Sequence, residues 1–436
     1  MITYRLIRIL PVTLFFLFLF AGKTSDFKKI ALPGEPEMIH LSLTEKKSDK
    51  AAPSITITWI SAAKDGSQFV KYGTSPDLNR ISRAEKKDFN EEMVLVSVLK
   101  NLKHNTKYFY MCGSDNTGWS PLYSFITEPE TDSNTSFRVG IFGDTQNNTQ
   151  NEEFQKTRYI SGLIQNYSPN FTLHMGDIVE KGSVTSNWKG FLSVTQELNA
   201  TAPLMPVLGN HDVENKSGEQ FQSPFPDFYS LFNLPGDEVN YSFTYKNVRF
   251  IGLFSGCAEA AARTDQVKYR TGSPEYVWLD EELSRAENDK NILWIVVYMH
   301  YPVFSFGWSN ITKWKEALLP LLEKHRIDLC LSGHRHVYER HAQLKNGVPV
   351  PNLSGTAFTA GKGTIYITNG TAGGNPTGTG GKDLPTMMFT PDEKIYSFAI
   401  MDISDESITY RVFDQDNVLI DWFTIEKEKS NNRSGN

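Results

Sequence analysis

Residues 137–144 read FRVGIFGD, a short apolar strand that ends in a glycine and an aspartate. The pattern recurs at residues 171–177, FTLHMGD, and at residues 204–212, where an apolar run ends in Gly-Asn-His-Asp. Glycine permits a tight turn and close backbone approach, so a short polar side chain can reach inward from the end of a strand. The pattern therefore predicts a sheet with polar groups at the ends of its strands.

Two further polar clusters follow apolar runs later in the chain. His300 comes directly after Ile292–Met299, and the sequence Gly-His-Arg-His at residues 333–336 follows Ile327–Leu331. Ligands of open α/β sheets gather at the carboxyl ends of the strands, so we expect all five clusters to converge on one point. The two histidines of residues 333–336 are two positions apart and would face the same side of an extended segment.

Apolar strands alternate with helical stretches between residues 137 and 368, which is typical of a layered α/β domain. Strands are predicted at Phe137–Phe142, Phe171–Met175, Leu204–Leu208, Val248–Phe254, Ile292–Met299, Ile327–Leu331 and Thr364–Thr368. Helices are predicted at Glu152–Gln165, Pro274–Glu287 and Lys313–Lys324. The run Gly370–Gly381 is rich in glycine and threonine and is predicted to be a mobile surface loop, and Tyr396–Ile425 returns to β structure.

Residues 30–128 show a different pattern, of short strands separated by turns. Runs of this kind are Ile55–Ile60, Phe69–Tyr72, Met93–Leu99, Lys107–Cys112 and Leu122–Thr127. Strands at this spacing predict a small β-sandwich. The polar segment Glu128–Ser136 contains Pro129 and is predicted to link the sandwich to an α/β domain at residues 136–426.

The N-terminus of the 436-residue chain indicates export. Arg5 and Arg8 precede the apolar run Ile9–Phe20, which Ala21 and Gly22 follow, and this pattern predicts a signal peptide over residues 1–22. The run is short for a spanning helix, which favours the signal peptide, and an uncleaved membrane anchor is the alternative. No second long apolar run follows, so we expect a secreted, periplasmic or cell-surface protein without a membrane span. The formal net charge of −6 does not favour nucleic acid as a partner.

The side chains at the five strand ends suit a pair of metal ions. The candidate ligands are Asp144, Asp177, Asn210, His300, His334 and His336. Carboxylate and imidazole together favour iron, manganese or zinc over magnesium or calcium, and the absence of cysteine ligands argues against a closed structural zinc site. Each cluster alone is more often structural, since Gly-Asp pairs are common in turns. Other histidines lack this context: His174 is expected in the core, and His40 on a surface or in a loop.

The order of these motifs resembles that of the calcineurin-like metallophosphoesterases, and within them the purple acid phosphatases. Val297 and His300 supply the fourth motif, Val-x-x-His, and Gly333–Arg340 continues as that family's last motif does. The resemblance extends to the β-sandwich, where Leu99–Tyr110 is similar to the late strands of fibronectin type III domains. It implies an N-terminal sandwich of that type followed by an α/β catalytic domain.

The resemblance also implies roles for single residues. Asp177 would bridge two metal ions, with Asn210, His300 and His334 completing the shell of the second ion, and Asp144 and His336 binding the first. His211 would face the substrate and stabilise the transition state or protonate the leaving oxygen. Asp212 would orient His211.

Two positions depart from the family pattern. Purple enzymes place a tyrosine three residues after the bridging aspartate, and here Glu180 occupies that position. Broader relatives use Asp-x-His in the first motif, and here Gln146 replaces the histidine. We therefore expect a colourless enzyme in which Gln146, water or another residue supplies the missing ligand.

The resemblance implies hydrolysis of small phosphate monoesters by attack of a metal-bridging hydroxide, as in acid phosphatases. A phosphodiesterase that acts on cyclic nucleotides or lipid headgroups would use the same metal pair, so this alternative stays open. A third interpretation is a surface-binding protein with an impaired catalytic domain, which only the weakened first metal position favours.

Overall fold

The structure is a computed structural model that describes residues 35–44, 51–63, 66–89, 91–146, 154–221, 223–256, 269–306, 312–352, 354–377 and 385–428. The predicted signal peptide at residues 1–22 lies outside these ranges. Within them, no helix is both long and apolar enough to cross a membrane.

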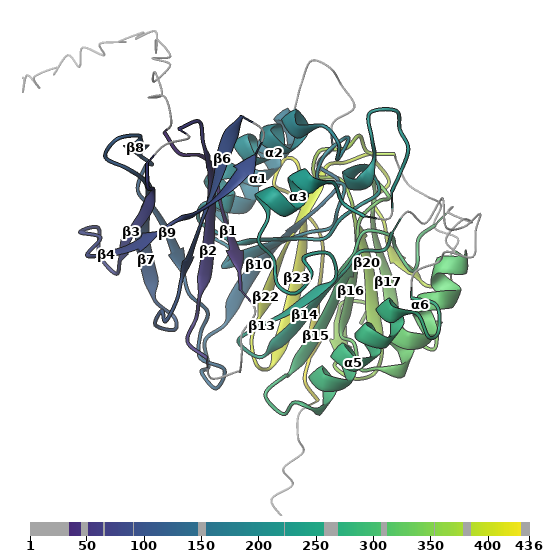
Figure 1. The fold of residues 1–436 in the computed structure, drawn as a ribbon. Coiled ribbons are helices and arrows are strands. Elements are labelled where there is room, and N and C mark those ends of the chain that lie inside the picture. Colours follow the sequence, from purple (N-terminus) through teal and green to yellow (C-terminus); the bar gives the residue numbers. More distant parts are fainter. Residues whose placement is uncertain are drawn as a thin grey trace, which may run out of the picture.

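The N-terminal part is a sandwich of two antiparallel sheets (Figure 1). The first sheet has the order β1-β2-β6-β5, with β1 at Glu37–Leu43, β2 at Ile55–Ser61, β5 at Glu85–Phe89 and β6 at Glu92–Leu99. The second has the order β4-β3-β7-β8, with β3 at Phe69–Gly73, β4 at Arg80–Arg83, β7 at Lys107–Ser114 and β8 at Gly118–Trp119, and β9 at Tyr123–Ile126 also pairs with β7. The predicted β-sandwich is confirmed.

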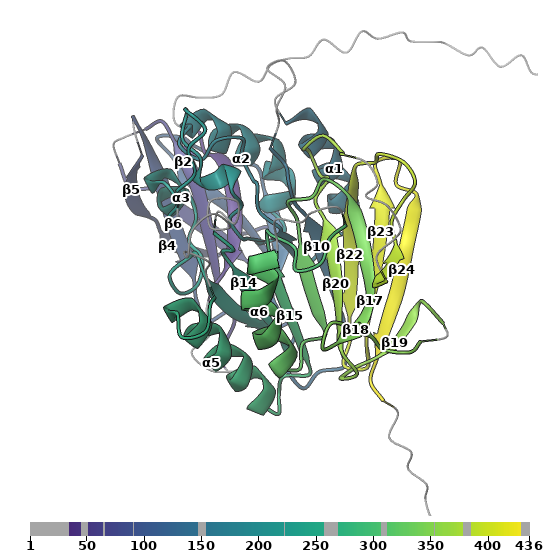
Figure 2. The same ribbon diagram turned by 90° about the vertical axis from the view of Figure 1, so that its right-hand side faces the viewer.

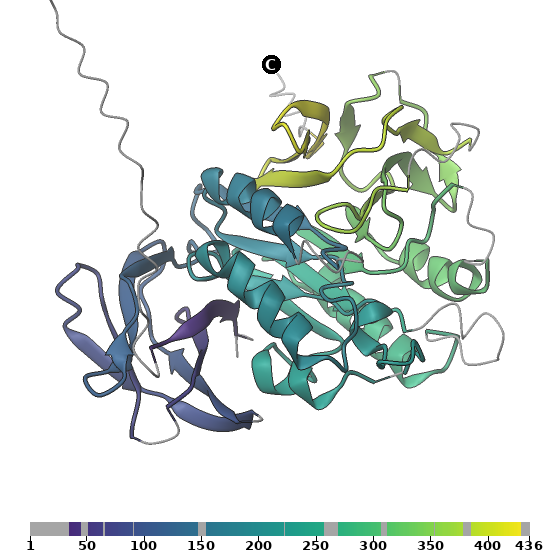
Figure 3. The ribbon, with the colours of Figure 1, turned by 90° about the horizontal axis from the view of Figure 1, so that it is seen from above.

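The first sheet of the sandwich is buried on both faces. Ile57 and Trp59 of β2 point into the sandwich core, whereas Ile60 belongs to the hydrophobic core of the α/β part. Alternation along β2 therefore separates two apolar environments rather than core from solvent. Seen from above, the sandwich lies against one side of the α/β part (Figure 3).

Polar contacts fix the two parts to each other. The buried Tyr110 hydroxyl donates to the Ala200 carbonyl oxygen at 2.8 Å, and Lys189 pairs with Glu92 at 2.7 Å. The prediction that His40 lies on a surface or in a loop was wrong. His40 is buried in β1, and its ring nitrogens lie 2.8 Å from the carbonyl oxygens of Met38 and Leu231.

The C-terminal part contains two sheets packed face to face, with helices outside each. The first sheet has the order β12-β11-β10-β22-β23-β24-β19, formed by Leu204–Pro206, Phe171–His174, Phe137–Phe142, Ser397–Ile403, Ser407–Asp414, Leu419–Glu426 and Ala357–Thr359. The second has the order β13-β14-β15-β16-β20-β17-β18, formed by Tyr241–Tyr245, Val248–Leu253, Trp294–Met299, Leu329–Ser332, Thr364–Asn369, Tyr338–Lys345 and Val348–Pro349, and β21 at Met387–Phe389 pairs with β17.

The helices cover the outer faces of these sheets. They are α1 at Gln155–Asn166, α2 at Thr185–Asn199, α3 at Pro226–Leu231, α5 at Pro274–Asn288 and α6 at Thr312–Lys324, with a short 3₁₀ turn η1 at His211–Val213. Helices α5 and α6 lie over the sheet that contains β15 (Figure 2). Leu283 of α5, Leu318 of α6 and Val297 of β15 belong to a second hydrophobic core. β15 alternates between this core and the central one that contains Val296, so all six of its residues are buried. The predicted α/β layers are confirmed.

The parallel strands run to a common edge. β10, β11 and β12 are parallel in one sheet, and β14, β15, β16 and β20 are parallel in the other. The seven predicted strands of this part agree with the structure within two residues at each end. Helix α2 was not predicted. Gly190 stands in its middle, where an added Cβ would lie 2.9 Å from the Phe154 ring.

Replacing Tyr110 by phenylalanine tests the contact between the two parts. The Tyr110→Phe variant removes a buried hydrogen-bond donor from the Ala200 carbonyl oxygen, so we expect the free energy of unfolding to fall by about 1–2 kcal/mol. Urea denaturation measures the change, with Tyr159→Phe on the exposed face of α1 as the matched control. Equal stability of the two variants would contradict a stabilising role for this contact.

Candidate metal centre

Three loops of the first sheet carry Asp144, Asp177 and Asn210 to the carboxyl ends of β10, β11 and β12. Asp144 and Asp177 have φ of 54° and 51°, in the left-handed region that non-glycine residues rarely adopt. The Asp144 N–H donates to the Gly176 carbonyl oxygen at 2.9 Å, which connects the two loops. Backbone strain of this kind is typical of functional sites, where the surrounding structure holds it in place.

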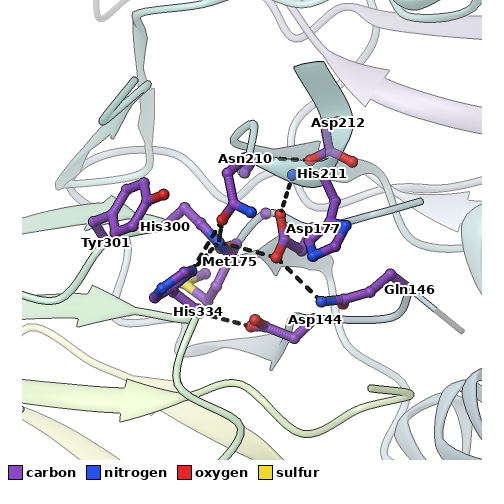
Figure 4. Close-up of polar contacts among 12 residues, drawn as sticks. Asp144, Gln146, Met175, Asp177, Asn210, His211, Asp212, His300, Tyr301 and His334 are labelled. Atoms are coloured by element: carbon purple, nitrogen blue, oxygen red, sulfur yellow. Dashed lines mark hydrogen bonds and ion pairs between the residues drawn. The ribbon is translucent and has the colours of Figure 1, made fainter. Parts of the chain in front are cut away.

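The second sheet supplies the histidines. His300 follows β15, and His334 and His336 follow β16. The Nδ1 of His300 donates to the Met175 carbonyl oxygen at 2.8 Å, so its Nε2 faces the centre of the site. That Nε2 lies 3.1 Å from Asn210 Oδ1, 3.1 Å from His334 Nδ1 and 3.2 Å from Asp177 Oδ2 (Figure 4).

The structure brings all six predicted ligands together. Ligand atoms of Asp177, His300 and His334 lie within 4.8 Å of one another, and Asn210 Oδ1 is 3.0 Å from His334 Nδ1. On the other side of Asp177, His336 Nε2 lies 3.5 Å from Asp144 Oδ1. The Nδ1 of His336 donates to the Asn375 carbonyl oxygen at 2.8 Å, which leaves its Nε2 facing Asp144.

The residues fit a pair of cations. Asp144 Oδ1 and Gln146 Oε1 are buried and have no hydrogen-bond partner. A buried oxygen in this state costs about 1–3 kcal/mol unless a donor or a metal ion satisfies it. Carboxylate, amide oxygen and imidazole nitrogen are together a donor set for a divalent transition metal.

The charges of the two aspartates are unequal. Burial, with the nearby Asp177, raises the pKa of Asp144 well above its ordinary value, although His300 opposes this. Burial would also raise the pKa of Asp177, but His300, His211 and His334 beside it hold that pKa below its ordinary value. The site therefore favours positive charge close to both carboxylates.

His211 stands at the mouth of the site, with its side chain 26% exposed. Its backbone N–H donates to Asp177 Oδ1 at 2.9 Å, and its Nδ1 donates to the Glu180 carbonyl oxygen at 2.9 Å. Burial lowers the pKa of His211, but Asp177 and the Glu180 carbonyl outweigh it and raise that pKa above its ordinary value.

Asp212 does not orient His211 as expected. Its Oδ1 accepts the backbone N–H groups of Ile178 and Val179 at 2.8 and 3.0 Å, and its Oδ2 accepts that of Gly209 at 2.7 Å. The 3₁₀ turn η1 directs this side chain into the protein, away from the His211 ring. Asp212 thus fixes the loop that carries Asp177, and the Glu180 carbonyl oxygen is the partner of His211.

His174 has a positioning role that its place in a core strand did not indicate. Its Nδ1 accepts the Gly176 N–H at 3.2 Å, so its Nε2 carries the proton and donates to Thr145 Oγ1 at 2.9 Å. The Thr145 hydroxyl donates onward to the Ile178 carbonyl oxygen at 2.8 Å. This chain joins the loops after β10 and β11 beneath the site.

The prediction of a surface loop at residues 370–381 was wrong for its first part. Gly370–Ala372 are buried, and the N–H groups of Ala372 and Gly374 donate to the carbonyl oxygens of Gly143 and Asp144 at 3.0 and 2.7 Å. An added Cβ at Gly370 would lie 2.6 Å from Asp144 Oδ2. The glycines permit this segment to pack directly against the site, whereas residues 378–384 lie outside the described ranges.

Residues 137–338 match the calcineurin-like phosphoesterase family, and residues 36–127 match the purple acid phosphatase N-terminal domain. The chain contains a calcineurin-like metallophosphoesterase domain. The family hydrolyses phosphoesters, so the prediction of a metal-dependent phosphoric ester hydrolase is confirmed at this level. The predicted resemblance to purple acid phosphatases is confirmed as well.

Several relatives of this chain are named as phosphatases. Phosphoenolpyruvate phosphatase of Allium cepa is 25% identical over 81% of this chain and 73% of its own length. Purple acid phosphatase 18 of Arabidopsis thaliana is 26% identical over 78% of this chain and 71% of its own length. The structure of a purple acid phosphatase from yellow lupin seeds superposes with a TM-score of 0.75 at 20% identity, covering 91% of this chain and 75% of the lupin chain, which shows the shared fold.

Substitution of Gly209 tests the close packing around Asp177 in this metallophosphoesterase. An added Cβ would lie 2.1 Å from Asp177 Oδ1 and 2.3 Å from the Asp177 nitrogen, so Gly209→Ala must displace the carboxylate. We expect metal affinity, measured by titration with a competing chelator, to fall about 10–100-fold.

Gly162→Ala is the matched control for this variant. Gly162 lies within α1, and an added Cβ there has nothing within 4 Å. It should leave metal affinity unchanged and raise stability by about 0.5–1 kcal/mol. Unchanged affinity in Gly209→Ala would show that the Asp177 carboxylate is not confined as described.

Proposed function

We propose that the chain is a phosphomonoesterase that holds two metal ions. Asp177, Asn210, His300 and His334 would hold the second ion, and Asp144, Asp177 and His336 the first. The observation that carries the proposal is the convergence of these six side chains at the carboxyl ends of the parallel strands of two mixed sheets. Two ions bound there would supply Lewis-acid charge and activate the attacking water.

The residues of the chain position the substrate around these ions. His211 is fixed by its backbone bond to Asp177 and by the bond from its Nδ1 to the Glu180 carbonyl oxygen. Since Nδ1 holds this bond, Nε2 is the atom that would meet the substrate. Protonated at Nε2, His211 would donate to the leaving oxygen of the ester.

Replacing His211 separates this role from metal binding. We expect His211→Ala to lower turnover of p-nitrophenyl phosphate about 10²–10⁴-fold, because the leaving oxygen loses its proton donor. Metal content by elemental analysis should stay at the wild-type value, and His104→Ala in the sandwich should affect neither. Loss of metal from His211→Ala would count against the assigned role.

Substrate preference and metal removal test the proposal as a whole. We expect faster turnover of p-nitrophenyl phosphate than of bis-p-nitrophenyl phosphate. We also expect loss of both activities on chelation and recovery when manganese, iron or zinc is restored. Preference for the diester would favour the phosphodiesterase alternative. Full metal content without activity on either ester would favour the binding protein.

We also propose that the enzyme is exported. Arg5 and Arg8 before the apolar run Ile9–Phe20 support this. Mass spectrometry of the protein recovered from its natural host should find an N-terminus close to Lys23. A mature chain that keeps residues 1–22 would support the membrane anchor instead.

A further inference from the structure

We propose that the side-chain carbonyl oxygen of Gln146 is the ligand that completes the first metal position. In this chain it would replace both the tyrosine of purple enzymes and the histidine of broader relatives. The inference rests on the proposed two-metal function. It makes a neutral amide a metal ligand at the first position. The family motifs do not include such a ligand, and it is not one of the carboxylate and imidazole ligands described above.

The position of the Gln146 amide supports this role. The residue is only 1% exposed, and its Nε2 lies 3.1 Å from Asp177 Oδ2 and 3.1 Å from His336 Nε2. Asp177 and His336 are two of the residues that would hold the first ion. The tip of the amide therefore lies beside the proposed first metal position (Figure 4 labels Gln146 beside Asp177 and Asp144).

The amide carries an unsatisfied acceptor. Gln146 Oε1 is buried without a hydrogen-bond partner, as is Asp144 Oδ1. A 180° turn of the amide exchanges its oxygen and nitrogen with almost no change of shape. The oxygen would then take the place of Nε2, 3.1 Å from one atom of Asp177 and one of His336.

That spacing suits ligands of a single ion. Two ligand atoms about 2.1 Å from an ion and at a right angle to each other are about 3.0 Å apart. The tip of Gln146 is close to this separation from Asp177 Oδ2 and from His336 Nε2, at 3.1 Å in each case. A cation there would satisfy Asp144 Oδ1 and, after the turn of the amide, Gln146 Oε1.

The backbone of Gln146 is held in place for this task. Its N–H and that of Thr145 both donate to the Asp177 carbonyl oxygen, at 3.2 and 2.9 Å. The Thr145 hydroxyl is held by His174 and Ile178. The amide is therefore carried on the same rigid loop pair as the two aspartates, as a ligand requires.

Glu180 is the competing candidate because it occupies the position of the family's tyrosine. The Glu180 backbone carbonyl oxygen accepts from His211 Nδ1 at 2.9 Å, so this residue lies beside His211. The side chain of Gln146, in contrast, lies 3.1 Å from both Asp177 Oδ2 and His336 Nε2. These distances favour Gln146.

A neutral ligand has a consequence for the type of metal. At the first position, the negative charge would come from Asp144 and in part from Asp177. The other two ligands, His336 and Gln146, would be neutral. A tyrosinate would add a negative charge that stabilises a trivalent ion. Without it, the site favours a divalent ion at the first position as well as at the second.

The test measures metal stoichiometry after loading with Mn²⁺ and gel filtration. Wild-type protein should retain two ions per chain, and their coupling should appear in the electron paramagnetic resonance spectrum. Gln146→Leu keeps the approximate shape of the side chain but removes its polar atoms. It should bind the first ion about 10–100-fold more weakly and show the spectrum of an isolated ion.

Two further variants make the result decisive. Gln146→His supplies the ligand of broader relatives and should retain both ions with coupling. Glu180→Gln should also retain both. Retention of both coupled ions with unchanged affinity in Gln146→Leu, or loss of the first ion in Glu180→Gln alone, would overturn the inference and leave the phosphatase proposal standing.

A different result would overturn the proposed two-metal function. A folded wild-type chain that never takes up a second ion would overturn the two-metal proposal itself, and the role of Gln146 with it. Circular dichroism of each variant establishes that the chain is folded. Gln146→His keeps the inference falsifiable if Gln146→Leu does not fold.

Discussion

The carboxylate of Asp177 is the group on which the rest of the site depends. Its Oδ1 accepts the backbone N–H of His211, and its Oδ2 lies beside Gln146 and His300. Its own backbone carbonyl oxygen accepts N–H groups from Thr145 and Gln146. Because a buried carboxylate needs donors or cations around it, the loops after β10, β12 and β15 are all held in place by one residue.

Close packing around this carboxylate and its neighbour explains the glycines at the strand ends. An added Cβ at Gly209 would meet Asp177, and one at Gly333 would lie 2.4 Å from Asp144 Oδ2. The site is therefore confined by backbone as well as by side chains. A confined shell holds its ligand atoms in place before the ions bind, which lowers the cost of ordering them.

The sequence predicted the two parts of the fold and that the six candidate ligands lie close together, because each strand and each loop carries its own local pattern. It did not predict the contacts that a neutral side chain makes with residues far away in the chain. Gln146 gains its environment from Asp177 and His336, which are 31 and 190 positions away. The motif suggested an orienting role for Asp212, but the direction of that side chain depends on η1.

The same reasoning accounts for the errors elsewhere. Local composition described Gly370–Gly381 as a surface loop, although its first residue lies so close to Asp144 that only glycine fits there. His40 was expected near solvent, since nothing in its own segment shows that α3 would cover it. Sequence patterns reveal which face of an element is apolar but not which neighbour covers the other face.

Burial of β2 on both faces has a consequence for how this enzyme can evolve. The two faces of this seven-residue strand pack in different hydrophobic cores. Ile57 and Trp59 pack in the core of the sandwich, and Ile60 packs in the core of the catalytic part. A recombination event that exchanged the sandwich for another would therefore alter the wall of the catalytic core at the same moment. The two parts are expected to change together, as one inherited unit rather than as interchangeable modules.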